Sequence, residues 1–127
     1  MRKVNDMEWY VEATAQLVAE IFVRDIARSR AFYEALGFAS EGDKGDFVSL
    51  SWEGHLLFLD QRLDLPPAPA QPLINIRVMV PDVERHWEQA QASGAVIVAP
   101  LADRGYGLLD FTIADPDGIG VRFGTRK

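Results

Sequence analysis

The 127-residue chain contains no cysteine and only two histidines, His55 and His86. The absence of thiolates excludes cysteine-based zinc sites, disulfides and thiol catalysis, and it fits a reducing compartment. No apolar run approaches the roughly 18 residues of a membrane span, and no basic leader precedes an apolar segment. We therefore expect a soluble, cytoplasmic protein that has no membrane partner.

Positive charge is also scarce. The chain has 13 Lys and Arg against 19 Asp and Glu, and its net charge of −6 is spread along the sequence with no basic stripe. Phosphate contacts need such a stripe, so we expect no nucleic-acid partner. Hydrophobic residues make up 48% of the chain, which is enough to build one core without metal or disulfide staples.

Two stretches of the chain carry the same residues at the same spacing. Asp25 precedes Gly37 by twelve residues, and Asp82 precedes Gly94 by the same interval. Between them lie segments with helical apolar spacing, and aspartate before a helix and glycine after it are typical capping residues. Self-similarity at a fixed offset indicates a duplicated module.

The duplication continues downstream of the predicted helices. Gly54 follows an Asp-Phe pair by eight residues, as does Gly118, and about seven extra residues separate the helix from the next strand in the second copy. Turn sequences at Glu53-Gly54 and at Asp115 to Gly118 are each bracketed by apolar strands. The predicted fold class is therefore α+β, with two βαβββ modules forming a curved mixed sheet around a cleft.

The predicted boundaries divide one structural domain into four segments. Residues 14–64 and 72–127 are the two modules, and residues 65–71 are a proline-rich connector that favours an extended path. Residues 1–13 are an N-terminal extension without a counterpart in the second copy. We expect this extension either to pack on a partner subunit or to form a simple tail.

Alternation along the strands predicts which face packs against the helices. Side chains at every second position of a strand point to the same face of the sheet. A series of apolar residues at alternate positions therefore marks the face that packs against the helices. The series are Leu17, Ala19, Ile21 and Val23; Ile74, Ile76, Val78 and Val80; and Ile119, Val121 and Phe123. The opposite, non-helical face then carries Val18, Glu20, Phe22, Asn75, Arg77, Met79 and Arg122.

The repeat resembles a known family in its details. The residues that carry the resemblance are Phe22-Val23-Arg24-Asp25 and Ala31-Phe32-Tyr33-Glu34-Ala35-Leu36-Gly37-Phe38 in the first copy, and Asp115-Pro116-Asp117-Gly118 in the second. Together they resemble the glyoxalase/bleomycin-resistance/extradiol-dioxygenase superfamily, or vicinal oxygen chelate fold, from about residue 17 to residue 124. The resemblance implies paired βαβββ modules around a cleft and commonly a homodimer, but it does not imply a single reaction.

In metal-dependent members of that family, the ligands come from inward positions on the first and last strand of each half. By the family pattern these positions are Val18, Phe58, Asn75 and Arg122 in this chain. None is a histidine or a carboxylate, and a guanidinium would bring positive charge to the place of a cation. The resemblance therefore points to the metal-free, bleomycin-resistance-like branch, without a metal or another cofactor. We expect His55 to be a surface residue beside a turn and His86 to be a solvated helix residue.

The cleft residues predicted from the face analysis and the family pattern carry both charge and aromatic surface. We expect Glu20 to pair with Arg77, either merely fixing how the halves meet or as part of a ligand site. Arg77 and Arg122 could bind a carboxylate, phosphate or enolate oxygen of a ligand, and Tyr106 could close over it or lie in an ordinary surface loop. The candidate ligand-binding residues are Glu20, Phe22, Trp52, Phe58, Asn75, Arg77, Tyr106 and Arg122.

Four functions are compatible with these residues. The first, which the missing metal ligands favour, is a metal-free protein that sequesters an aromatic or peptide-like compound, as in bleomycin resistance. The second is a metal-dependent lyase, isomerase or dioxygenase that recruits His55 with Glu20 or Asp60. The third is a metal-free enzyme in which Glu20 acts as a base, and the fourth is a protein whose cleft is filled by its own side chains. The catalytic residues, if there are any, are not identified by the sequence.

Overall fold

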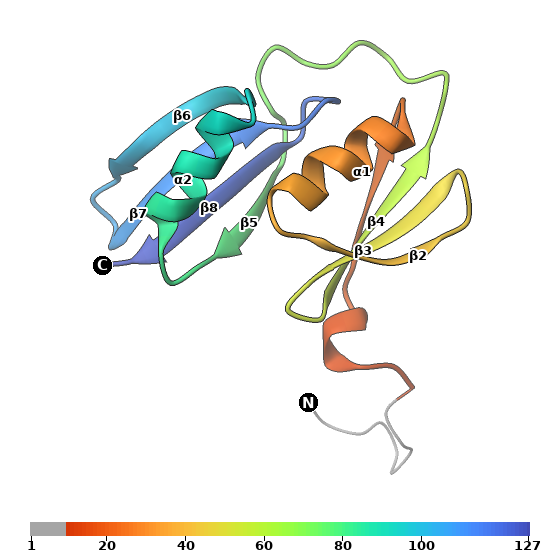
Figure 1. Cartoon of the computed structure of the whole chain (residues 1–127), viewed down its shortest axis with the longest axis horizontal. Helices are drawn as coiled ribbons and strands as arrows, with labels where there is room; N and C mark the ends of the chain where they lie inside the picture. Colours follow the sequence, from red (N-terminus) through yellow and green to blue (C-terminus); the bar gives the residue numbers. More distant parts are fainter. Residues whose placement is uncertain (1–9) are drawn as a thin grey trace.

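Each half of the chain folds into one helix and one four-stranded sheet (Figure 1). The structure is a computed structural model that describes residues 10–127, so residues 1–9 of the predicted extension lie outside the described residues. A short 3-10 turn at Ala13–Ala15 precedes the first half. The first half consists of β1 (Ala19–Val23), α1 (Ile26–Ala35), β2 (Ala39–Asp43), β3 (Phe47–Trp52) and β4 (His55–Gln61), and the second of β5 (Asn75–Met79), α2 (Val83–Ala92), β6 (Val96–Asp103), β7 (Leu108–Ala114) and β8 (Gly120–Arg126).

The two sheets have the same topology. Their strand orders are β1-β4-β3-β2 and β5-β8-β7-β6. In each sheet the first strand runs parallel to the last, and the other pairs are antiparallel. The predicted α+β fold of two βαβββ modules is confirmed. The extra residues of the second copy lengthen β6 and form the turn that follows it.

The capping residues expected from the repeat begin and end both helices. Asp25 accepts a hydrogen bond from the backbone N–H of Arg28 at 3.2 Å, and Asp82 accepts one from Arg85 at 3.4 Å. Each bond satisfies one of the amides that a helix leaves unpaired at its start. Gly37 follows α1 with φ of 112°, a backbone conformation that favours glycine.

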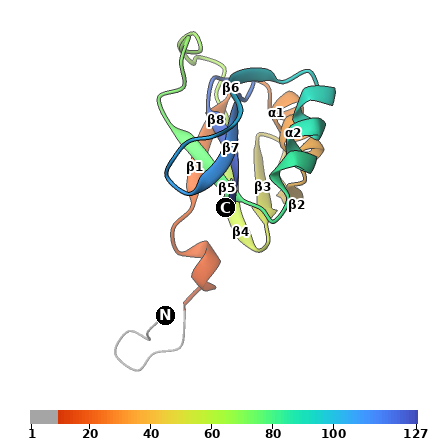
Figure 2. The same ribbon diagram turned by 90° about the vertical axis from the view of Figure 1, so that its left-hand side faces the viewer.

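Both helices lie on the same side of the sheets (Figure 2). The shared core lies beneath them and includes the fully buried Val23, Val121 and Phe123. Leu17 and Ile74, which the alternation placed on the packed face, are instead 94% and 57% exposed. Both lie before their strands begin, where the pleat no longer fixes the direction of a side chain. Ala19, the first residue of β1, was also placed on the packed face and is exposed. Among residues 10–127, no helix is long and apolar enough to cross a membrane.

The turn of each half packs on the helix of the other half. Tyr33 of α1 is fully buried, and its hydroxyl donates to Asp115 Oδ2 of the β7–β8 turn at 2.7 Å. At the opposite contact, Trp52 at the end of β3 lies against His86 of α2, at 5.8 Å between ring centroids. His86 also stacks on Phe123 at 5.1 Å with the rings only 7° from parallel.

The prediction that His86 is a solvated helix residue is therefore wrong. Its Nδ1 is buried and has no hydrogen-bond partner within the described chain. Burial lowers the pKa of His86, and the neighbouring Arg85 lowers it further. His55 is exposed at the start of β4, as predicted.

Candidate functional site

Asp110 is the most deeply buried charged residue on the non-helical face of the second sheet. Along β7 the side chains alternate, so that Phe111 and Ile113 enter the core while Asp110 and Thr112 face the other way. Arg122 of β8 is paired across the sheet with Thr112, which makes Asp110 its diagonal neighbour. This register brings the carboxylate and the guanidinium together on one face.

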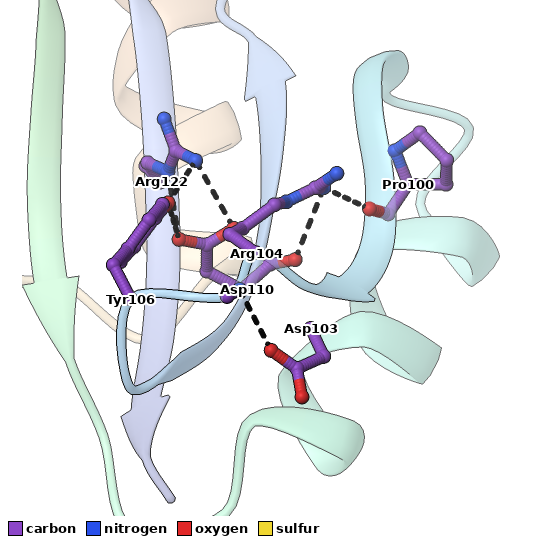
Figure 3. Close-up of polar contacts among 7 residues, drawn as sticks. Pro100, Asp103, Arg104, Tyr106, Asp110 and Arg122 are labelled. Atoms are coloured by element: carbon purple, nitrogen blue, oxygen red, sulfur yellow. Dashed lines mark hydrogen bonds and ion pairs between the residues drawn. The ribbon is translucent and has the colours of Figure 1, made fainter.

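Three side chains donate hydrogen bonds to the carboxylate of Asp110 (Figure 3). Arg122 donates through Nε to Oδ2 at 3.0 Å and through Nη2 to Oδ1 at 3.1 Å. Arg104 donates through Nε to Oδ1 at 2.9 Å, and the Tyr106 hydroxyl donates to Oδ2 at 2.8 Å. Nη2 of Arg122 also donates to the Tyr106 hydroxyl at 2.7 Å. The Asp110 side chain is only 1% exposed, so its charge is compensated almost entirely by these groups.

The protonation states follow from these contacts. Burial alone would raise the pKa of Asp110, but hydrogen bonds from Arg122, Arg104 and Tyr106 outweigh it and hold that pKa below its ordinary value. The pKa of Arg122 is raised, chiefly by its hydrogen bonds to Asp110. The pKa of Tyr106 is raised by loss of hydration and by its bond to Asp110. The cluster therefore holds one carboxylate, two guanidinium groups and a neutral phenol.

The β6–β7 turn positions Tyr106 over this face. Gly105 and Gly107 flank it with φ of 81° and 89°, conformations that a residue with a side chain rarely adopts. The Gly105 amide donates to Asp103 Oδ1 at 2.8 Å, and the side chain of Lys127 pairs with Asp103. The turn is thus held by its own polar contacts, with Tyr106 55% exposed.

Arg77 of β5 lies near this cluster and has no partner in it. No residue in the described part of the chain forms a hydrogen bond or ion pair with its guanidinium, but its charge is close enough to lower the pKa of Tyr106. Arg77 also lines a groove of roughly 420 Å³ between β5 and the first half. The other groove residues are Ala19, Phe38, Trp52, Glu53, His55, Leu56, Leu57, Ile76, Val78 and Met79.

The expected Glu20–Arg77 ion pair is not formed. Both side chains are exposed, and they belong to different sheets. The pair would require equivalent positions of the two halves to face each other, and β1 and β5 lie in separate sheets. Arg122 instead finds its carboxylate within its own sheet, at Asp110.

The non-helical face of the first sheet is aromatic. Phe22 is 44% exposed, and Arg62 lies 4.4 Å from its ring centroid. Phe58 packs on Phe47 at 5.2 Å. Glu20 is paired with Phe58 in the register of β1 and β4 and lies on the same face. This face offers flat apolar surface with charges at its edge.

The structure groups the eight predicted site residues in three places. Arg122, Tyr106 and Arg77 come together on the second sheet, with Asn75 at the start of β5, where the absence of a side chain at Gly120 leaves room for its amide. Trp52 lines the groove, and part of its ring packs against Phe38 and Phe123. Glu20, Phe22 and Phe58 occupy the face of the first sheet.

Sequence reasoning missed two members of the cluster, Asp110 and Arg104. Asp110 served only as a marker of the repeat, although it alternates with the apolar Phe111 and Ile113. A carboxylate on the cleft face of a central strand is a signal in itself, because a buried charge needs a partner. Arg104 could not be found this way, since its position depends on the turn that follows β6.

The residues at the family's metal positions do not fit a metal ion. The side chains of Val18 and Phe58 have no lone pair to donate, and the guanidinium of Arg122 is bound to Asp110. Residues 10–127 contain no group of three or more His, Asp or Glu side chains that could hold a metal. No chemical step through a metal can be derived from this donor set.

Comparisons with known proteins give one family and one fold. The sequence profile of the Glyoxalase/Bleomycin resistance protein/Dioxygenase superfamily matches residues 14–123. No curated protein sequence matches the chain.

Several solved structures share the architecture. A glyoxalase/dioxygenase from Nostoc punctiforme has a TM-score of 0.77 at 17% identity and covers 98% of this chain and 99% of its own. TioX from Micromonospora sp. ML1 has a TM-score of 0.73 at 22% identity, covering 89% and 99%. A bleomycin resistance determinant encoded on the transposon Tn5 has a TM-score of 0.69 at 20% identity, covering 88% and 98%. At these identities the likeness establishes the fold alone.

Proposed function

Since the chain belongs to the glyoxalase/bleomycin resistance protein/dioxygenase superfamily, we propose that it is a metal-free small-molecule binding protein of the bleomycin-resistance type. It sequesters an aromatic or peptide-like compound in a cleft bounded by the non-helical faces of the sheets and by the groove beside β5. The candidate ligand-binding residues on these surfaces are Glu20, Phe22, Trp52, Phe58, Asn75, Arg77, Tyr106 and Arg122. Reversible binding, without a chemical step, is its activity.

One observation carries the proposal. Arg122 occupies a position at which metal-dependent relatives would supply a ligand, and its guanidinium donates twice to the buried Asp110. A cation could bind here only if the carboxylate of Asp110 left the guanidinium of Arg122. This would break a buried ion pair and put the cation beside the positively charged guanidinium. The groove of roughly 420 Å³ is within the usual size range of small-molecule sites.

The catalytic alternatives have less support. A metal site at His55 would need Glu20 or Asp60, but His55 is exposed beside a turn and Asp60 lies 3.5 Å from Arg62 Nη2. Glu20 as a general base would need water-poor surroundings, and it is exposed on β1. We therefore propose binding and not catalysis.

Metal independence is tested by elemental analysis of untagged protein and by thermal-shift titration with nickel, zinc, manganese and iron salts. We expect no stoichiometric metal and no increase in the melting temperature, and binding of any compound found in a screen of bleomycin and aromatic compounds should be unaffected by EDTA. About one metal ion per chain, with a raised melting temperature, would overturn the proposal.

We also propose that the protein forms a homodimer that completes the cleft. β1 and β5 are edge strands in their sheets, so each has one side without a strand partner within residues 10–127. Phe22 and Met79 on these strands are 44% and 46% exposed. Sedimentation equilibrium should give twice the chain mass, and Phe22→Lys should shift the mass toward that of one chain. A monomer at all concentrations would contradict this proposal.

A further inference from the structure

We infer that the ligand is an organic anion, with a carboxylate or phosphate group held by Arg77 and Arg122 and an apolar body lying in the groove that Arg77 lines. This inference rests on the proposed binding function and assigns the ligand its charge. It is carried by the balance of charges around Asp110, by the free donors of the two arginines and by the strand register that pairs Arg77, a groove residue, with Arg122.

The cluster around Asp110 has an excess of positive charge. Asp110 supplies one negative charge, whereas Arg104 and Arg122 supply two positive charges, so the cluster carries a net charge of +1. Arg77, paired with Arg122 in the register of β5 and β8, adds another positive charge on the same face of the sheet. The chain as a whole has a net charge of −6, so this local excess of positive charge is opposite in sign to the charge of the whole chain. An anion is the partner that such a place favours.

The arginines keep donors available. Arg122 uses Nε and Nη2 for Asp110 and Tyr106, but its other terminal nitrogen points away from Asp110 (Figure 3) and has no acceptor among residues 10–127. The guanidinium of Arg77 is free of partners within the same residues and exposed. A planar guanidinium that is already fixed by a carboxylate loses little side-chain entropy when it binds a second anion.

The groove supplies the apolar part of the site. Arg77 lines the groove and is the register partner of Arg122 in the pairing of β5 with β8, so the groove and the cluster meet at these two neighbouring side chains. Around it, Leu56, Ile76 and Met79 give an apolar wall, and Trp52 gives an aromatic one. Glu53 also lines the groove at the β3–β4 turn, and its carboxylate opposes an anion placed beside it. The anionic group of the ligand is therefore directed to Arg77 and the body to the apolar wall.

The test uses three probes that share one ring system and differ in charge: 2-naphthoate, 2-naphthyl phosphate and the neutral 2-naphthamide. Isothermal titration calorimetry of the full chain should show the two anions binding about tenfold more tightly than the amide, which corresponds to about 1.4 kcal/mol, because hydrogen bonds to a charged acceptor are stronger than those to a neutral one. Added NaCl should weaken the anions and leave the amide nearly unchanged. The tighter of the two anions identifies the carboxylate or phosphate class.

Arg77→Gln is the informative variant because the side chain is exposed and unpaired in the described chain, so the fold should not depend on it. It should cost the anions about tenfold in affinity and should not affect the amide. Arg85→Gln is the matched control, since it removes the same charge from the exposed side of α2. Glu53→Gln should tighten anion binding.

The outcomes separate this inference from the proposed function. Equal binding of the amide and the anions, or equal effects of Arg77→Gln and Arg85→Gln, would overturn the anion inference and leave the binding function intact. If none of the three probes binds but a neutral or cationic compound of the bleomycin and aromatic screen does, the anion inference alone fails. If no probe and no compound of that screen binds at millimolar concentration, the proposed function fails, and the inference fails with it.

Discussion

Replacing Asp110 by asparagine changes one buried acceptor into a donor. The carboxylate accepts four side-chain hydrogen bonds, from Arg104, Tyr106 and twice from Arg122. An asparagine retains only one oxygen. Its NH2 group must therefore face either the Nε of Arg122 and the Tyr106 hydroxyl, or the Nε of Arg104 and the Nη2 of Arg122. Two guanidinium groups then share one neutral acceptor. We expect Asp110→Asn to be strongly destabilising.

The magnitude follows from how far the pair is buried. Breaking a buried ion pair by removing one partner costs about 3–5 kcal/mol. The side chains of Arg104 and Arg122 keep exposures of 24% and 21%, so water can recover part of the loss, and we take the lower end, about 3 kcal/mol. For a domain of this size, 1 kcal/mol corresponds to roughly 3–5 °C in melting temperature. The expected decrease is therefore about 10–15 °C.

Differential scanning calorimetry of the variant measures this decrease. Asp103→Asn is the matched control, because it makes the same chemical change in the adjoining strand at a half-exposed side chain, and the asparagine keeps an oxygen that can accept from the Gly105 amide. The control should melt close to the parent protein. If Asp110→Asn melts within about 2 °C of Asp103→Asn, less than the effect of 1 kcal/mol, the carboxylate does not hold the cluster together.

Three further predictions concern the contacts between the halves and the contact of the second half with the connector. Tyr33→Phe removes the buried hydroxyl bonded to Asp115 and should lower stability by about 1–2 kcal/mol in urea titrations, with unchanged far-UV circular dichroism; an unchanged midpoint would contradict the contact. Burial holds the pKa of His86 below its ordinary 6.5, so the unfolded chain binds the proton more readily, and the melting temperature should fall as the pH decreases below 6.5; a variant His86→Phe that retained the same decrease would assign it elsewhere. Gly118→Ala should cost about 2 kcal/mol, because φ is 89° and the new Cβ would lie 2.9 Å from Pro69; a melting temperature equal to that of the parent would refute this.

The local rules of the fold were accessible from the sequence. Capping by Asp25 and Asp82 depends on hydrogen bonds within one helical turn, and both were predicted and observed. Alternation identified Ile21 and Val23 as buried, since the pleat fixes their side once a strand exists. The same rule failed for Leu17, because alternation does not say at which residue a strand begins.

Long-range contacts were not accessible in this way. His86 has charged neighbours in sequence, but Trp52 reaches it from a turn more than thirty residues away. Strand alternation predicted that Arg77 and Arg122 share a face, whereas Tyr106 was predicted only as a loop residue that could close over a ligand. The contact between Asp110 and Arg122 was not predicted because no rule of sequence spacing pairs these two residues. Only the register of β7 and β8 makes them diagonal neighbours.

The turn of each half contacts the helix of the other half, and these two contacts are related by a two-fold symmetry within one chain. The equivalent of His86 in α1 is Ser29, which is also buried and donates its hydroxyl to Asp117 of the opposite turn. A single βαβββ unit that used such a contact twice would close as a symmetric dimer, with identical residues on both sides of the axis. Here the connector links the two copies covalently, so the two contacts need not use identical residues. One side has become polar, with a serine and an aspartate, and the other aromatic, with a histidine and a tryptophan. Because the two halves are covalently linked, their sequences can differ, and the non-helical face of one sheet carries Arg77 and Arg122 while that of the other carries Phe22 and Phe58.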